Sequence, residues 1–178
     1  MQARRVVTGH AADGKSVFVS DETIEPVRLA LLPGAEFHRL WARDATASIP
    51  DDVTTTPSPS YFPNVDGFRF GFFTLGPESV ASPADIDIEA ALQELSEKLP
   101  GMAEVMEPEH PGMHMTDTID FDIVISGEVW LELDDGVEVQ LRAGDTVIQN
   151  GTRHAWHNRS SQPCTLAVAL IGAARTAG

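Results

Sequence analysis

The chain has 178 residues, the size of one domain with extensions, and 42% of them are hydrophobic, which excludes disorder of the whole chain. Its net charge of −15 is uneven, because residues 51–145 hold 21 acidic residues against three basic ones, Arg69, Lys98 and Arg142. Nucleic acids are bound chiefly by Lys and Arg that neutralise phosphates. The acidic surface therefore excludes nucleic acid and anionic membrane as partners.

Two further features indicate where the protein resides. The sequence has no run of about 18 apolar residues, the length that spans a bilayer, and its first residues lack the apolar core of a secretory signal. We therefore expect a cytoplasmic protein. The single cysteine, Cys164, cannot form an intrachain disulfide, and its apolar neighbours predict a small core residue.

The N-terminal third is predicted to be extended. Short runs rich in β-branched residues, 4–8 and 16–20, flank a turn and predict a hairpin, and residues 27–32 predict another strand. Residues 45–67 contain four prolines among Ser, Thr and Asp. Neither a helix nor a central strand tolerates these prolines, so this segment is predicted to be a surface loop.

One amphipathic helix is predicted after a strand at residues 68–75. Apolar residues recur at helical spacing through residues 84–99, acidic residues follow Pro83, and Pro100-Gly101 ends the pattern. Such a helix needs an apolar surface on which to pack.

The C-terminal part changes to a period of two. Residues 128–142 alternate apolar and polar side chains on both sides of an Asp-Asp-Gly turn, which predicts a β-hairpin. Further strands are predicted at 146–149, 154–159 and 164–171. Closely spaced strands with almost no helix between them indicate an all-β antiparallel sandwich or barrel.

Two of the extended segments carry candidate functional residues. In an extended chain, residues of one parity share a face, so His114, Thr116, Thr118 and Asp120 point to the same side. In the later strand His154 shares a face with Trp156 and Asn158. Two strands that bear histidine can therefore converge on one site.

These residues resemble the two motifs of the cupin superfamily. In the first motif, of general form G-x5-H-x-H-x3–4-E-x6-G, the two His, the Glu and the last Gly correspond to His114, Thr116, Asp120 and Gly127. In the second motif, which ends G-x2-H-x3-N, the matching residues are Gly151, His154 and Asn158, with Gln149 where proline is usual. The resemblance implies a double-stranded β-helix, or jelly roll.

The resemblance covers residues 112–171, which we expect to form the barrel core. Residues 1–111 are then an N-terminal extension of strands, the loop at 45–67 and the helix at 84–99, packed on the barrel. Residues 172–178 are a tail, and the whole chain is expected to form one structural domain.

The resemblance also implies a metal site with a modified ligand set. The family holds a divalent metal with three His and one Glu, but here Thr116, whose hydroxyl is a poor ligand, replaces one His, and Asp120 replaces the Glu. The remaining set, His114, Asp120 and His154, suits Fe, Mn, Ni or Zn with open positions for substrate. The alternative is a metal-free pocket in which His114 or His154 acts as a general acid or base.

Substrate contacts are expected around this set. Trp156, Phe70 and Phe72 are aromatic residues that would line a pocket, Arg153 would pair with a substrate carboxylate, and Thr116 would face the ligand. His110 and His157 are expected at the surface.

The expected function follows from the resemblance. It implies a small metal-dependent enzyme, a homodimer, that acts on a carbonyl or carboxylate compound by lyase-type chemistry: decarboxylation, dehydration or isomerisation. An iron-dependent dioxygenase is one alternative, because two His and a carboxylate leave adjacent positions for substrate and dioxygen. A non-catalytic small-molecule-binding protein is the other.

Overall fold

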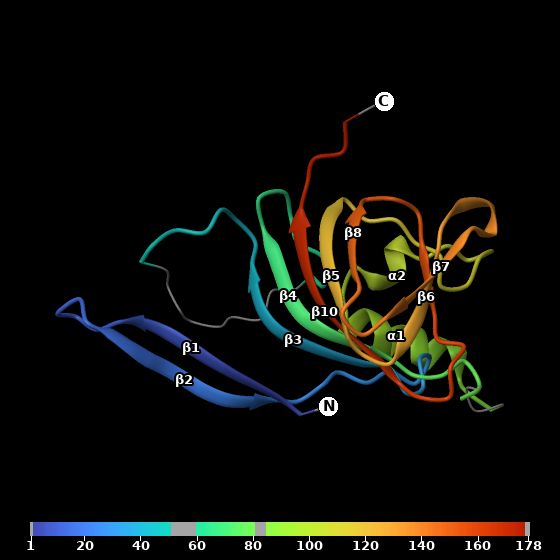
Figure 1. Ribbon diagram of the computed structural model, residues 1–178, viewed down its shortest axis with the longest axis horizontal. Coiled ribbons are helices and arrows are strands. Elements are labelled where there is room, and N and C mark those ends of the chain that lie inside the picture. Colours follow the sequence, from blue (N-terminus) through green and yellow to red (C-terminus); the bar gives the residue numbers. More distant parts are fainter. Residues whose placement is uncertain (1, 51–59, 81–84, 177–178) are drawn as a thin grey trace.

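The computed structural model describes residues 2–50, 60–80 and 85–176, which are mostly strands (Figure 1). The elements in chain order are β1 (Ala3–His10), β2 (Ser16–Ile24), β3 (Glu36–Arg43), β4 (Phe68–Leu75), α1 (Ile88–Lys98), α2 (Met102–Val105), β5 (Thr118–Ser126), β6 (Glu128–Glu132), η1 (Asp134–Gly136), β7 (Glu138–Arg142), β8 (Thr146–Asn150), β9 (Ala155–His157) and β10 (Cys164–Gly172). No helix in the described segments is long and apolar enough to cross a membrane.

Two antiparallel sheets form the barrel. The larger has the strand order β3-β4-β10-β5-β8 and the smaller has the order β7-β6-β9. Neighbours far apart in sequence pair directly, as in β10 with both β4 and β5. This arrangement confirms the predicted all-β double-stranded β-helix, and it confirms the hairpin at 128–142, whose strands are β6 and β7.

Two apolar clusters hold the layers together. One lies between the two sheets and contains Val124, Val129, Leu131, Leu141, Cys164 and Leu166. The other joins the helices to β3 and contains Leu29, Ala35, Phe37, Leu95, Leu99 and Met102. Because Phe73 of β4 packs against both clusters, they meet inside the barrel. Cys164 is fully buried, as its apolar neighbours predicted.

The amphipathic helix forms near the predicted position. α1 begins after Asp87, whose side chain accepts a hydrogen bond from the backbone N–H of Ala90. It ends at Lys98, with Leu99 as its cap, directly before Pro100-Gly101. Its buried residues are Ala91 and Leu95, four apart on one face. The predicted first residue, Ala84, lies outside the described residues.

One predicted strand is wrong. Residues 27–32 form only a single bridge, from Val27 to Phe37, and then turn, with the Leu32 N–H donating to the Leu29 carbonyl. The apolar pattern there reflects burial of Leu29 in the helix cluster, not pairing in a sheet. The strand lies further on, in β3, which was not predicted. Of the predicted loop at 45–67, residues 51–59 lie outside the described residues, and the rest contains no helix or strand.

The N-terminal segment divides into two parts. β3 and β4 are members of the five-stranded sheet, so the barrel takes strands from outside residues 112–171. β1 and β2 instead pair only with each other and extend to one side of the barrel (Figure 1). Arg5 connects this hairpin to the barrel, because its guanidinium donates to the Leu40 carbonyl at 3.0 Å and lies over the ring of Trp41.

Candidate functional site

A cavity of about 170 Å³ lies inside the barrel, with Met102 of α2 in its lining. Its polar lining residues include His114, Thr116, Asp120, Asp122, His154 and Trp156, and its apolar lining includes Phe37, Phe73, Met102, Met106, Leu166 and Val168. An apolar cavity with a few convergent polar groups is typical of a small-molecule site. The structure thus places both motif histidines and Asp120 at one cavity.

The two histidines form the centre of the site. The backbone N–H of each donates to the carbonyl of the other at 2.9 Å, so His114 and His154 lie opposite each other. Their ring centroids are 4.2 Å apart. Although the two residues lie 40 positions apart in the sequence, this backbone pairing brings the imidazoles side by side.

The ring nitrogens have different environments. Nδ1 of His114 lies 3.0 Å from the Gly112 carbonyl, and Nδ1 of His154 lies 2.9 Å from the Thr152 carbonyl. A carbonyl oxygen only accepts, so each Nδ1 carries the proton and each Nε2 has the lone pair. Neither Nε2 has a hydrogen-bond partner among the described residues. Such an Nε2 can accept a proton or bind a metal.

Burial keeps both imidazoles neutral. It lowers the pKa of His114 below its usual value, against the effect of the Gly112 carbonyl. Burial, and then the neighbouring His114, lowers the pKa of His154 to about 4. Both rings are therefore proton acceptors at neutral pH.

Two carboxyl groups of β5 face the same cavity. Burial raises the pKa of Asp120 to about 6, against a hydrogen bond from Thr118. Burial, and then the charge of Asp120, raises the pKa of Asp122 to about 7. The Asp120 Oδ1 atom is buried and has no hydrogen-bond partner. A buried unpartnered carboxylate oxygen is costly, and a ligand or cation that binds it would remove that cost.

The side chains of Thr116, Thr118 and Asp120 form a hydrogen-bonded row. The hydroxyls of Thr116 and Thr118 lie 2.7 Å apart, and Thr118 donates to Asp120. Because Thr118 uses its proton on Asp120, Thr116 must donate to Thr118. Thr116 lines the cavity as expected, with its hydroxyl committed to this row.

The remaining predicted site residues divide between the cavity and the surface. Trp156 lines the cavity, with its ring 6.1 Å from that of His154. Arg153 instead pairs with Glu107 at 2.7 Å and with Asp134 at 2.9 Å, and it does not line the cavity. Phe70 and Phe72 project from the outer face of β4, where they line a groove beside the β1–β2 hairpin.

Sequence reasoning missed one titratable lining residue, Asp122. Asp122 continues the row of alternate residues that contains Asp120, so extending the period-two pattern by one step would have found it. Tyr61 also lines the cavity, and burial raises its pKa above the usual value. It comes from the proline-rich loop, where no periodic pattern indicated its position.

Three motif residues support the backbone around the site. Gly127 forms the β5–β6 turn with φ +78°, and a Cβ there would lie 2.6 Å from the Pro163 carbonyl oxygen. Gly151 has φ +58° and packs against the backbone of Thr116. Asn158 is fully buried, and its amide donates to the carbonyls of Leu75 and Gln162 at 2.9 and 2.8 Å. Asn158 therefore has a structural role.

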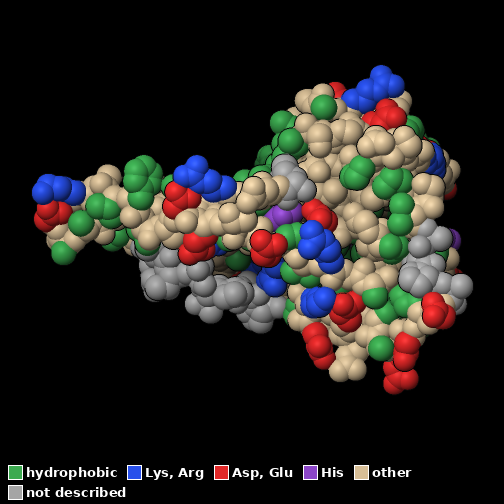
Figure 2. Space-filling model, turned by 90° about the horizontal axis from the view of Figure 1, so that it is seen from below, with side chains coloured by type: hydrophobic (Ala, Val, Ile, Leu, Met, Phe, Trp, Pro, Cys, Tyr) green, Lys and Arg blue, Asp and Glu red, His purple; other side chains and the backbone are tan. Residues whose placement is uncertain are grey.

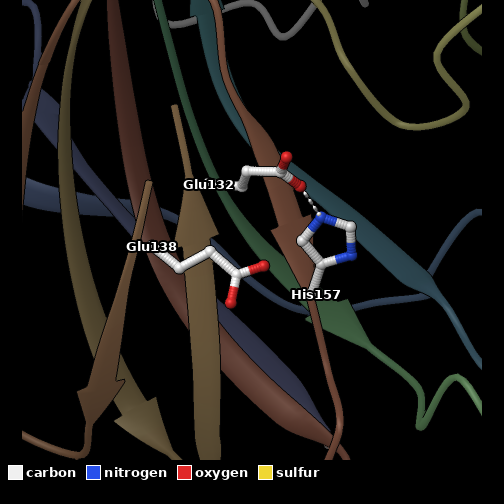
Figure 3. Close-up of side chains that lie close together, drawn as sticks. All are labelled: Glu132, Glu138 and His157. Carbon is white, nitrogen blue, oxygen red and sulfur yellow. Dashed lines mark hydrogen bonds and ion pairs between the residues drawn. The ribbon is translucent and has the colours of Figure 1, made fainter. Parts of the chain in front are cut away.

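One cluster among the described residues brings three potential metal ligands close together. The group of three whose ligand atoms all lie within 4.8 Å of one another is Glu132, Glu138 and His157, on the smaller sheet (Figure 3). Both ring nitrogens of His157 already contact carboxylates, Glu78 and Glu132, each at 2.7 Å, and Glu138 pairs with Arg159. This cluster is a surface ion-pair network. His114, Asp120 and His154 share the cavity but are not gathered as closely.

The sequence of this chain is similar to those of known proteins. The sequence profile described as "Cupin domain" matches residues 102–170. "Oryzines biosynthesis cluster protein J" of Aspergillus oryzae is 32% identical over 147 residues, covering 72% of this chain and 80% of that protein. "Phomopsin biosynthesis cluster protein C'" of Diaporthe leptostromiformis is 29% identical over 157 residues, covering 88% and 70%. "Cupin-domain-containing oxidoreductase virC" of Hypocrea virens is 26% identical over 165 residues, covering 86% and 66%.

Proposed function

The chain belongs to the cupin superfamily, and we propose that it is an enzyme that transforms a small carbonyl or carboxylate compound in the barrel cavity. The proposed reaction is lyase-type: decarboxylation, dehydration or isomerisation. The observation that carries this proposal is the pair of neutral imidazoles, His114 and His154, held side by side with each Nε2 available.

The residues of the cavity would divide the chemistry among them. His114 and His154 hold their protons at Nδ1, so either can take a proton from substrate at Nε2 and return it at another atom. Trp156 and the apolar lining exclude water and orient the substrate. The two histidines are the proposed catalytic residues, and Trp156 and Thr116 are proposed substrate contacts.

The donor set also fits a divalent metal ion, and we include Fe, Mn, Ni or Zn in the proposal. The fit rests on the two Nε2 atoms and on the buried, unpartnered Asp120 Oδ1. Asp120 is one methylene shorter than the Glu of the family motif, so it becomes the third ligand only after its side chain turns toward the histidines. When bound, the ion supplies Lewis-acid polarisation of a substrate oxygen.

A second candidate function is oxidation by an iron-dependent dioxygenase. It is favoured by the relative whose name describes it as a cupin-domain oxidoreductase. The same two histidines and Asp120 would serve it. Iron content together with oxygen uptake on addition of a candidate substrate would favour the oxidation, and turnover in the absence of oxygen would favour the lyase.

Metal titration tests the ligand assignment. The chelator-treated protein is titrated calorimetrically with Zn²⁺, Fe²⁺, Mn²⁺ and Ni²⁺. We expect Asp120→Asn to weaken binding by roughly 10- to 100-fold, His154→Ala to abolish it, and His110→Ala, a change at an exposed loop histidine, to leave it unchanged. Unchanged affinity in Asp120→Asn would remove Asp120 from the ligand set, and no binding to the unmodified chain would remove the metal.

A turnover assay tests the catalytic role separately. The protein is incubated with a panel of small keto and hydroxy acids, and products are followed by NMR. Conversion that is lost in His154→Ala and kept in His110→Ala supports the enzyme. Ligands that bind to the unmodified chain without being converted would instead indicate the non-catalytic binding protein. We propose a cytoplasmic homodimer as the form in which the enzyme acts.

A further inference from the structure

A second cavity adjoins the barrel cavity. Its volume is about 340 Å³, and both spaces share four lining residues, Phe37, Tyr61, Val168 and Leu170. Small-molecule sites commonly have volumes of roughly 300–1,000 Å³. The barrel cavity, at about 170 Å³, is smaller than this range by itself. A ligand of ordinary size that reaches the histidines would therefore extend into the second cavity.

The second cavity is lined by basic residues. Four of the 12 Lys and Arg residues of this acidic chain contribute to it: Arg5, Arg39, Arg43 and Arg69. We call it the arginine chamber. It lies at β3, the edge strand next to the β1–β2 hairpin (Figure 1), and Lys and Arg side chains gather on the body beside the base of that hairpin (Figure 2). The barrel cavity instead contains the carboxyl groups of Asp120 and Asp122.

The strand register shows how the two spaces are arranged. Arg39 of β3 is paired with Gly71 of β4. Val168 of β10 is paired with Gly71 on one side and with Asp122 of β5 on the other. Directly paired residues share a face of the sheet, so these four form one row across its inner face. With strands ~4.8 Å apart, the row is ~14 Å long between its end Cα atoms. A guanidinium lies at one end and a carboxyl group at the other.

A neighbouring row repeats this arrangement. Arg69 of β4 is paired with Leu170 of β10, and Leu170 is paired with Asp120 of β5. The residues between the charged ends are apolar in both rows, and Gly71 has no side chain to fill the space beside Arg39. The inner face of the sheet is therefore basic at β3 and β4, apolar in the middle and acidic at β5.

Of the two arginines at the ends of these rows, Arg39 is the one suited to a ligand. The buried guanidinium of Arg69 donates to the Asp44 carboxylate at 2.5 Å and to four backbone carbonyls, which gives it a structural role. Arg39 donates to the Ser60 carbonyl at 3.2 Å. A guanidinium has five N–H donors and can hold a carbonyl and a carboxylate together. Burial, and then the neighbouring Arg69, lowers the pKa of Arg39, and a bound anion would oppose this effect.

Tyr61 lies where the two spaces meet. Its residue lines both of them, and the charges of Arg39, Asp120 and Asp122 all act on its hydroxyl. The basic residue of the chamber and the acidic residues of the barrel cavity are thus close enough to influence the same side chain. One ligand that passes Tyr61 can contact both ends.

We propose that the substrate carries a carboxylate remote from its reacting carbon, and that Arg39 binds this carboxylate while the reacting end lies at His114 and His154. The inference rests on the proposed function, because that function places the reacting end at the histidines. The carboxyl groups of Asp120 and Asp122 disfavour a second negative charge in the barrel cavity, whereas a guanidinium binds a carboxylate through two hydrogen bonds. The arginine chamber thereby selects the class of substrate and sets its orientation.

Benzoate and benzamide test the chamber, because they have nearly the same shape and differ in charge. The unmodified chain, titrated calorimetrically with each, should bind benzoate roughly 10- to 100-fold more tightly, as expected for hydrogen bonds between charged groups. Arg39→Gln should bind the two probes equally. Arg142→Gln, at an exposed arginine at the end of β7 in the other sheet, should keep the preference. Equal binding by the unmodified chain, or a preference that survives in Arg39→Gln, would overturn the proposal.

A conservative variant controls for the fold. Arg39→Lys keeps the positive charge but loses the paired donors, so it should retain only part of the preference for benzoate. It replaces Arg39→Gln if that variant fails to fold by circular dichroism, and an undiminished preference in Arg39→Lys would then contradict binding by the guanidinium.

The histidine variant separates this inference from the proposed enzyme. His154→Ala should keep the preference for benzoate, because the probe binds in the arginine chamber. A preference that is lost in His154→Ala and kept in Arg39→Gln would place the carboxylate at the histidines and overturn the inference alone. Absence of turnover in the panel assay, with a preference that depends on Arg39, would overturn the proposed enzyme and support Arg39 as a carboxylate site.

Discussion

The two faces of β5 have opposite chemistry. The inner face presents Asp120 and Asp122 to the cavity, and the outer face presents isoleucines and a phenylalanine to solvent. In most proteins the inner row is apolar and the outer row is polar. Each inversion carries a free-energy cost in the isolated chain, and each is relieved by a different partner. The polar interior favours a small polar ligand or ion, and the apolar exterior favours another protein surface.

The largest expected effect is at the inner site. His154→Ala should lower turnover by roughly 10²- to 10⁴-fold, the usual contribution of a general acid or base. Turnover of the substrate found in the panel assay measures it, with His110→Ala as the control. If His154→Ala kept its activity, His154 would not be a catalytic residue.

Adjacent residues of β5 test the two faces directly. Val124→Ala, in the cluster between the sheets, should reduce the free energy of unfolding by roughly 2 kcal/mol. Ile123→Ala, on the outer face, should cost less than about 1 kcal/mol within one chain. Urea unfolding at two protein concentrations separates packing within the chain from contact between chains. If Val124→Ala and Ile123→Ala lowered the free energy of unfolding equally at both protein concentrations, the contrast between the two faces would be wrong.

The pH dependence of stability tests the inner carboxyl groups. The pKa of Asp122 rises from its ordinary value to about 7 on folding, so between about pH 4 and 7 the folded chain binds more protons than the unfolded chain. This contribution to stability is present at low pH and is lost as pH rises through 7. As pH rises from 5 to 8, the free energy of unfolding of Asp122→Asn should therefore increase by roughly 1–3 kcal/mol relative to that of the unmodified chain.

Melting curves with chelator present measure that difference across the pH range. His154 acts in the opposite direction, because its lowered pKa favours unfolding as pH falls from about 6.5 to about 4. The effect of Asp122 is therefore the difference in melting temperature between Asp122→Asn and the unmodified chain at each pH, because His154 contributes equally to both. A difference that does not vary with pH would show that Asp122 titrates normally.

The smallest expected effect is in the ion-pair network of the smaller sheet. His157→Gln removes contacts to Glu78 and Glu132, whose side chains are 49% and 24% exposed. Exposed pairs of this kind contribute about 0.5 kcal/mol and are screened by salt. The change in melting temperature should be small and should vanish in 1 M salt. A loss of metal binding in this variant would identify the cluster in Figure 3 as a metal site.

Sequence periodicity predicted β4, β6, β7, β8, β9 and β10, because each has a buried and an exposed face. For β5 it indicated only an extended segment at 114–120, whereas the strand runs from Thr118 to Ser126. It failed at residues 27–32, where apolar side chains pack against α1 and α2 without strand pairing. It also assigned Phe70 and Phe72 to the cavity as aromatic residues, although β4 directs them to the outer face. Residue type does not determine which face of a strand a side chain occupies.

The sequence by itself determined the alternation of the strands, the helix and its end, and the two motif histidines, because these depend on local spacing. Only the tertiary structure decided that His114 forms a backbone bridge with His154 and that Asp122 joins Asp120 in the same cavity. The reason is that burial, which shifts the pKa values of these groups, depends on segments far apart in the chain. The pattern Ile119, Phe121, Ile123 and Ile125 is visible in the sequence as alternation. Its position on the outer face becomes clear only when β5 is seen between β8 and β10.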